Sequence, residues 1–133
     1  GIPVMGHVGF TPQSEHGLGG HMIQGRGEAA DAVLADAKAV EAAGAFAVVL
    51  EMVPADLAEK ITKELTIPTI GIGAGNKTDA QILVWTDFAG LGEKSPSFAK
   101  QYLNLRQSLH DAASSYRSEV ASGEFPTTEQ SFS

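Results

Sequence analysis

The 133-residue sequence predicts an α/β fold with about four parallel strands and surrounding helices. The first observation is a set of short apolar runs, rich in Val and Ile and each followed by a helix or loop signal. These runs are Ile2–Met5, Phe46–Leu50, Thr69–Ile72 and Ile82–Trp85. Each run is continuously apolar rather than alternating, which indicates strands covered on both faces, as in parallel sheets.

The second observation is helical periodicity between the runs. Residues 28–43 carry apolar side chains on one stripe, and Gly44 follows them as a typical residue after a helix C-terminus. Pro54 suits the first position of a second helix, which we expect to end at Leu65, before the Ile67-Pro68 step. The predicted order is therefore strand, helix, strand, helix, strand.

A long terminal helix is predicted over residues 96–122, beginning after Ser95. Its apolar side chains recur at spacings of three and four residues, a stripe that is typical of packing. Residues 123–133 contain Pro126 and several Ser and Thr residues, so we expect them to form an extended tail.

The length fits half of a known architecture better than a whole one. A (β/α)₈ barrel, also called a TIM barrel, has eight strands and typically about 250 residues. Four parallel strands with three helices close neither a barrel nor a typical doubly wound sheet. We therefore interpret residues 1–133 as the C-terminal half of a single (β/α)₈ barrel domain. The remaining elements are expected to precede Gly1, and the edge of the first strand would then be exposed in the isolated chain.

Composition narrows the function classes. The chain has 9 Lys and Arg residues against 16 Asp and Glu residues, a net charge of −7, which argues against nucleic acid or an anionic membrane as partner. The absence of cysteine excludes disulfides, thiolate metal sites and a cysteine nucleophile. No apolar run approaches the roughly 18 residues of a membrane span. These features favour a cytoplasmic protein that binds a small molecule.

Chemistry-bearing residues follow three successive runs. His7 comes after the first run, Glu51 after the second, and a glycine-rich bend, Gly71–Asn76, after the third. In parallel α/β folds, ligands bind beyond the carboxyl ends of the strands. The sequence therefore predicts a site that brings these three features to one end of the sheet.

Glu51 and His7 are the candidate site residues, and each has a structural alternative. Glu51 interrupts an apolar stretch, where a carboxylate can become basic enough to take a proton from carbon. It could equally be a carboxylate at the N-terminus of the helix that begins at Pro54. His7 lies between glycines and could donate a hydrogen bond to an oxygen of a ligand, or could be a satisfied core histidine.

Other candidates are weaker. His16 and His21 lie in the long glycine-rich loop Thr11–Gly27, at a spacing that matches no standard zinc motif; the loop could be a lid or a subunit contact. The glycines of the 71–76 bend lack the Rossmann and P-loop patterns, which leaves two alternatives. The bend could admit a close approach by substrate or a neighbouring strand, or it could form an anion-binding nest.

These same residues carry a resemblance to a known family. The motifs are, in chain order, GIPVMGHVGFTPQS (1–14), LGG (18–20), QGR (24–26), EAAGA (41–45), LEMVP (50–54), IPTIGIGAG (67–75), FP (125–126) and SF (131–132). Together they resemble ketopantoate hydroxymethyltransferase, also called 3-methyl-2-oxobutanoate hydroxymethyltransferase. The resemblance runs from end to end of this chain and covers the C-terminal half of that enzyme.

The resemblance implies a (β/α)₈ barrel that transfers a hydroxymethyl group from 5,10-methylenetetrahydrofolate to 3-methyl-2-oxobutanoate, giving ketopantoate in pantothenate and coenzyme A biosynthesis. It assigns Glu51 as the proton acceptor and His7 as a contact to the keto acid. Mg²⁺ is held by acidic residues of the N-terminal half of the family's enzymes, so no metal ligand is expected in this chain. The expected partners are that N-terminal half and further copies of the chain, since the family forms large homo-oligomers, commonly decamers.

Two alternatives to this assignment remain. The chain could be a catalytically incomplete fragment or paralogue that acts as an oligomerisation or interaction module. It could also be a relative that acts on another 2-oxo acid.

Overall fold

A computed structural model describes all 133 residues and divides them into two compact units, residues 1–83 and residues 84–133. The first unit contains one parallel sheet whose strands follow the order of the sequence. The strands are β1 (Met5–Gly9), β2 (Ala47–Glu51), β3 (Thr69–Ile72) and β4 (Ala80–Gln81). The predicted α/β class with four parallel strands is confirmed, and the arrangement is that of part of a (β/α)₈ barrel.

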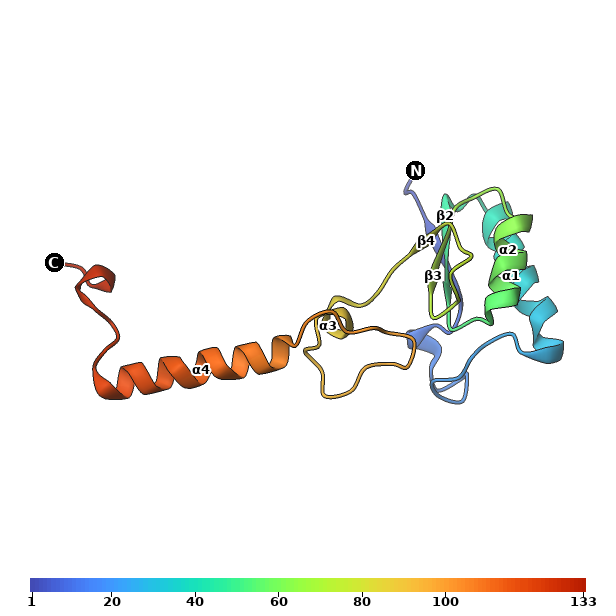
Figure 1. Cartoon of the computed structure of the whole chain (residues 1–133). Helices are drawn as coiled ribbons and strands as arrows, with labels where there is room; N and C mark the ends of the chain where they lie inside the picture. Colours follow the sequence, from blue (N-terminus) through green and yellow to red (C-terminus); the bar gives the residue numbers. More distant parts are fainter. The chain divides into compact units, whose positions relative to one another are not determined.

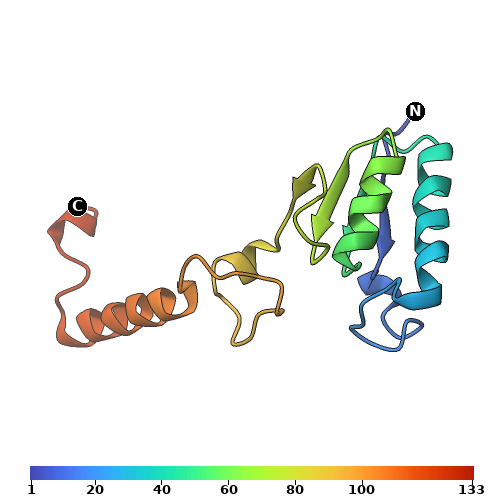
Figure 2. The same cartoon turned by 45° about the vertical axis from the view of Figure 1, so that its right-hand side comes forward.

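Two helices, α1 (Ala30–Ala42) and α2 (Ala55–Glu64), lie side by side against one face of the sheet (Figures 1 and 2). The predicted helices 28–43 and 54–65 are thus confirmed to within two residues at each end. Between the helices and the sheet lies a core of buried side chains. It consists of Val8, Val33, Leu34, Ala37, Val48, Leu50, Val53, Leu57, Ala58, Ile61, Leu65 and Ala74. Full burial of one Val, Leu or Ile side chain stabilises a fold by about 1.5–3 kcal/mol.

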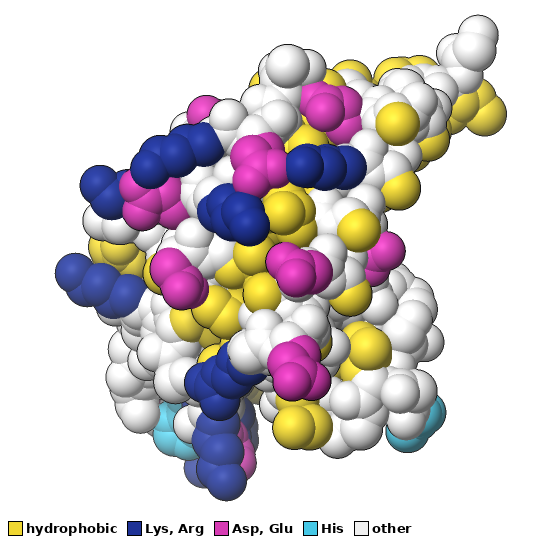
Figure 3. Space-filling view, turned by 90° about the vertical axis from the view of Figure 1, so that its right-hand side faces the viewer, with side chains coloured by type: hydrophobic (Ala, Val, Ile, Leu, Met, Phe, Trp, Pro, Cys, Tyr) yellow, Lys and Arg dark blue, Asp and Glu magenta, His cyan; other side chains and the backbone are white.

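The outer face of the two helices is charged. Figure 3 shows Lys, Arg, Asp and Glu side chains of both signs interspersed over it, with hydrophobic side chains visible between them. One ion pair joins the two helices: Lys38 of α1 lies 2.5 Å from Glu64 of α2. A second lies within α2, where Lys63 is 2.7 Å from Glu59, one helical turn before it. Each exposed ion pair of this kind contributes only about 0–1 kcal/mol to the stability of the fold.

Two predicted strands were wrong in position. The first was expected at Ile2–Met5, but Pro3 lacks an N–H, residues 1–4 are exposed, and regular pairing with β2 begins only at Met5. The last was expected at Ile82–Trp85, but pairing with β3 is confined to Ala80 and Gln81. Beyond Leu83 the chain enters the second unit, where Trp85–Phe88 forms the short helix α3 instead.

A polar network around the buried Thr69 connects β3 and α2 to Asp79, the residue before β4. Asp79 Oδ2 accepts hydrogen bonds from the N–H of Thr69 at 2.9 Å and from its hydroxyl at 3.0 Å. The Thr69 hydroxyl also lies 2.8 Å from the hydroxyl of Thr62 on α2. Thr69 is fully buried, so these contacts satisfy polar atoms that have no access to water.

The second unit contains α3, helix α4 (Leu105–Ser122) and a 3₁₀ helix at Thr128–Gln130. The prediction of a helix from residue 96 was wrong for its first nine residues. The N–H groups of Tyr102 and Leu105 donate to the carbonyls of Phe88 and Ala89, so they make no helical bond back toward Pro96. The 3₁₀ turn also interrupts the tail, 123–133, that was expected to be extended throughout.

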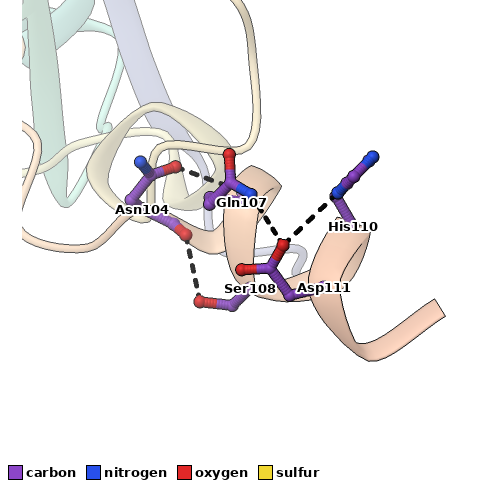
Figure 4. A network of polar contacts seen from close by, with 5 residues as sticks. All are labelled: Asn104, Gln107, Ser108, His110 and Asp111. Carbon is purple, nitrogen blue, oxygen red and sulfur yellow. Dashed lines mark hydrogen bonds and ion pairs between the residues drawn. The ribbon is translucent and has the colours of Figure 1, made fainter. Parts of the chain in front are cut away.

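Asn104 begins α4. Its side-chain oxygen accepts a hydrogen bond from the N–H of Gln107 at 3.2 Å, and its carbonyl accepts one from the Ser108 hydroxyl at 3.1 Å (Figure 4). Gly123 follows Ser122 with a φ of 79°, the left-handed conformation that commonly ends a helix. No helix of the protein is both long enough and apolar enough to cross a membrane. That residues 1–133 belong to one barrel domain stays a prediction.

Candidate active site

His7 and Glu51 share one face of the sheet. In the strand register, His7 is opposite Val49, and Glu51, two residues further along β2, is opposite Gly9. Side chains alternate along a strand, so His7 and Glu51 point away from the face on which Val8 and Leu50 enter the core. They therefore lie on the face of the sheet that α1 and α2 leave uncovered.

The two side chains are in direct contact. His7 Nε2 lies 2.9 Å from Glu51 Oε2, and the side chains are 35% and 15% exposed, respectively. An ionised carboxylate can only accept, so a bond across this contact requires the proton to be on Nε2. The other carboxylate oxygen, Oε1, has no hydrogen-bond partner within the protein. Every buried side-chain oxygen and nitrogen does have such a partner, so Oε1 is not buried and is accessible to solvent. The contact thus holds one carboxylate oxygen and leaves the other free.

The backbone at the end of β2 is fixed on both sides. The carbonyl of Glu51 accepts a hydrogen bond from the N–H of Phe10 at 2.8 Å, and the N–H of Met52 donates to the carbonyl of Ile72 at 2.9 Å. Gly9, with a φ of 92°, allows this close approach, because a Cβ there would lie 2.3 Å from the Glu51 carbonyl oxygen. The carboxylate is therefore carried by a well-anchored strand end.

The described side chains do not fit a magnesium site. Mg²⁺ requires near-octahedral oxygen coordination, usually with at least one or two carboxylates. No group of three or more His, Asp or Glu side chains in the 133 residues lies close enough together to hold a metal ion. Glu51 has only His7 as an ionisable neighbour within ion-pair distance.

Comparison with known proteins shows the family to which the chain belongs. The sequence profile described as ketopantoate hydroxymethyltransferase matches residues 1–128 and so includes both His7 and Glu51. This chain belongs to the ketopantoate hydroxymethyltransferase family. It is 65% identical over 133 residues to the 3-methyl-2-oxobutanoate hydroxymethyltransferase of Leifsonia xyli, 62% to that of Frankia alni and 58% to that of Corynebacterium glutamicum.

These alignments include 99% of this chain in each case, but only 48%, 44% and 49% of the three relatives. The chain therefore spans about half the length of the curated relatives it matches, and the match is to their C-terminal half. The family enzymes are transferases by name, so this chain corresponds to part of a transferase.

The glycine-rich bend, whose sequence carries part of the family resemblance, directly follows β3. Gly73 and Gly75 have φ values of 62° and 76°. A Cβ on Gly75 would lie 2.5 Å from the Cβ of Ala55, the first residue of α2. A close approach is present, but the group that approaches is the start of a helix and not the neighbouring strand that was considered; an approach by substrate stays a prediction.

The two loop histidines, His16 and His21, do not join the site. His21 Nδ1 lies 2.9 Å from Glu15 Oε1, and its ring packs against Phe10 at 4.8 Å between centroids. His16 and His21 are both exposed. They contact neither Glu51 nor each other, which agrees with a role in the loop itself.

The structure adds two features that the sequence did not indicate. A hollow of about 560 Å³ lies beside His7, lined also by Thr11 and by Asp36 and Val40 of α1. Met52, directly after Glu51, has a φ of 51°. Methionine is not a residue type that signals a positive φ, so no sequence pattern could have revealed this conformation.

Proposed function

We propose that this chain supplies the proton-accepting carboxylate of a ketopantoate hydroxymethyltransferase. The reaction transfers a hydroxymethyl group from 5,10-methylenetetrahydrofolate to 3-methyl-2-oxobutanoate, giving 2-dehydropantoate for pantothenate and coenzyme A biosynthesis. Family membership and the names of the relatives support the reaction. The observation that carries the residue assignment is the His7–Glu51 contact of 2.9 Å at the end of the sheet where parallel α/β folds bind ligands.

Glu51 is proposed to remove the proton from C3 of the oxo acid. The free oxygen Oε1 receives this proton, while His7 holds Oε2 and so fixes the plane of the carboxylate. The electron pair left on C3 forms the new bond to the one-carbon unit of the folate. Both bonds from that carbon to folate nitrogens break, water supplies the hydroxyl oxygen, and tetrahydrofolate leaves with its nitrogens protonated. General-base catalysis by a positioned side chain typically contributes about 10²–10⁴-fold to a rate.

Mg²⁺ is part of the proposed enzyme but not of the steps assigned to this chain. Bound by oxygen ligands, the ion would polarise the keto acid and favour loss of the C3 proton. The described residues form no group that could hold it, so its ligands are proposed to lie in the N-terminal half of the full-length protein.

The test replaces Glu51 in a full-length protein. A suitable protein joins the N-terminal half of the Leifsonia xyli relative to residues 1–133, since the two C-terminal halves are 65% identical. Glu51→Gln keeps the size of the side chain and removes the base, so we expect kcat to fall by about 10²–10⁴-fold while keto-acid binding is retained. The matched control is Glu59→Gln, which removes an exposed carboxylate of α2. Unchanged turnover by Glu51→Gln would disprove the assignment.

A second candidate is a non-catalytic oligomerisation or interaction module. The specific observation that favours it for the 133-residue chain alone is the lack of a group that could hold the metal. Turnover by the full-length chimera, with keto acid, folate and Mg²⁺, separates the candidates, because activity that Glu51→Gln abolishes would exclude the inert module, whereas an inactive chimera would favour it.

The proposed partners follow from the same assignment. They are the N-terminal half of the enzyme and further copies of the chain in a homo-oligomer such as a decamer, in the cytoplasm. The support within this chain is that Leu109, Tyr116 and Val120 of α4 are 47–58% exposed, although apolar side chains at helical spacing normally pack against something. Light scattering on the full-length protein would test the assembly, and a monomer would contradict it.

A further inference from the structure

Met52 is the one residue other than glycine with a positive φ in the 133 residues. At a φ of 51°, its Cβ crowds the backbone, which costs free energy for every residue except glycine and least for Asn and Asp among the others. Such a conformation persists only where the surrounding structure enforces it, and it occurs preferentially at functional sites. Here it directly follows Glu51.

Both backbone polar groups of Met52 are engaged. Its N–H donates to the carbonyl of Ile72 at the end of β3, and its carbonyl accepts the N–H of Gln24 at 2.9 Å. Gln24 belongs to the long loop that follows β1. Met52 therefore joins the ends of two strands to that loop at one point.

The left-handed turn at Met52 also ends β2. Val53 is 2% exposed and packs in the core between the sheet and the helices, and α2 begins at Ala55. The chain therefore leaves the uncovered face of the sheet and enters the core within two residues of Glu51. An extended conformation at residue 52 would continue the strand and move both the Glu51 side chain and the start of α2.

We propose that Met52 is a positioning residue for the Glu51 carboxylate. Its left-handed backbone, held by Ile72 and Gln24, ends β2 immediately after Glu51 and keeps Oε2 in contact with His7 Nε2. This inference rests on the proposed role of Glu51 as the proton acceptor. It predicts that the conformation of residue 52, more than its side chain, controls turnover.

The first test compares Met52→Asn with Met52→Val in the full-length chimera described above. Asn adopts a positive φ readily, so we expect its kcat to stay within about threefold of the parent. Val is β-branched and resists this conformation, so we expect kcat to fall by about 100-fold through misplacement of the base, with KM changed much less. The pH profile of kcat should change for Met52→Val alone, which a loss of stability without misplacement would not cause. Met22→Val, at an exposed loop position, is the control for a methionine-to-valine change.

The second test leaves Met52 in place, and it applies even where Met52→Val does not fold. Gln24→Pro deletes the N–H that holds the Met52 carbonyl, whereas Gln24→Ala keeps that N–H and loses only the side-chain bond to Met22. Loss of one such hydrogen bond should lower kcat by about five- to tenfold in Gln24→Pro, with Gln24→Ala close to the parent.

The outcomes separate the two proposals. Turnover within threefold of the parent in both Gln24→Pro and a folded Met52→Val, in a protein that Glu51→Gln inactivates, would overturn the positioning role and leave Glu51 as the base. Equal losses in Met52→Asn and Met52→Val would also overturn it, because the side chain rather than the backbone would then matter. Full activity of Glu51→Gln would instead disprove the proposed function.

Discussion

The carboxylate of Glu41 accepts two hydrogen bonds from Thr66, one from its backbone N–H at 2.6 Å and one from its hydroxyl at 2.7 Å. The N–H of Ile67 donates to the same oxygen at 3.2 Å. Glu41 lies near the end of α1, and Thr66 lies in the connection from α2 to β3. One side chain thus joins the end of α1 to the segment that leads into β3.

This relationship predicts a pH-dependent stability. The Thr66 hydroxyl bond, followed by the Thr66 backbone bond, holds the pKa of Glu41 below its usual value of 4.5. A carboxyl group with a lowered pKa stabilises the folded state above its usual pKa, and this stabilisation is lost as the pH falls through the folded-state pKa. Glu41→Gln should therefore lower Tm at pH 7, and lower it by progressively less as the pH falls below about 4.5. Glu28→Gln, at an exposed glutamate outside any ion pair, is the control for thermal unfolding measured across pH; a constant difference would contradict the prediction.

The hydroxyl of Thr69 should be important for stability. Thr69→Val keeps the shape of the side chain and removes the hydroxyl that joins Thr62 to Asp79. Because Thr69 is fully buried, we expect a loss of about 1–3 kcal/mol in the free energy of unfolding, measured by urea denaturation. Thr128→Val, at an exposed threonine, should change it by less than about 0.5 kcal/mol. Equal effects of the two variants would show that the network contributes nothing.

The sequence predicted those elements whose signals are local. The run Thr69–Ile72 became β3 with the predicted bounds, and Gly44 follows α1 in the left-handed conformation expected of it. The last strand was misplaced because its position depends on the contact between Asp79 and Thr69, ten residues apart, rather than on its own apolarity. Local hydrophobicity does not specify pairing partners.

In the candidate site too, the sequence predicted the local features but not those that depend on contacts between distant residues. The rule that ligands bind beyond the carboxyl ends of parallel strands predicted both His7 and Glu51 as site residues, each directly after its strand. The structure instead places His7 within β1 and Glu51 as the last residue of β2. Their contact depends on the parallel register, in which Gly9 stands opposite Glu51 and leaves that position without a side chain. The turn at Met52 depends on hydrogen bonds to distant segments, which no local pattern specifies.

The start of α4 was missed, although the sequence contains a signal for it. Asn104 is a preferred N-cap residue directly before the apolar Leu105, and its side chain does accept from Gln107. Asn104→Ala should destabilise the helix by about 1 kcal/mol, whereas Asn104→Asp, which keeps an acceptor, should not. Hydrogen exchange of the first-turn amides of α4 would show this as faster exchange in Asn104→Ala alone. Equal rates in both variants would mean that the cap is dispensable.

Close approach and backbone conformation make separable contributions at the glycines of the first unit. Gly44 and Gly75 have positive φ values of 91° and 76°, but a Cβ at Gly44 would meet nothing within 4 Å, whereas one at Gly75 would lie 2.5 Å from Ala55 Cβ. Gly44→Ala should therefore lower the free energy of unfolding only by the penalty for a left-handed backbone at alanine, about 1–2 kcal/mol. Gly75→Ala should cost more, because α2 must also shift. Chemical denaturation of both variants tests this, and equal losses would exclude the steric contribution.

His7 should affect turnover through the orientation of Glu51. In the full-length chimera, His7→Ala removes the only ionisable partner of the carboxylate, so we expect kcat to fall by about tenfold or more, the value of one charge-assisted hydrogen bond. His7→Gln places an amide N–H where it can donate to Oε2 and should recover part of this loss. His110→Ala, at an exposed histidine of α4, is the control. Steady-state kinetics would distinguish this role from keto-acid binding alone, because a His7 that contacts only the substrate would raise KM, whereas one that orients the base would lower kcat.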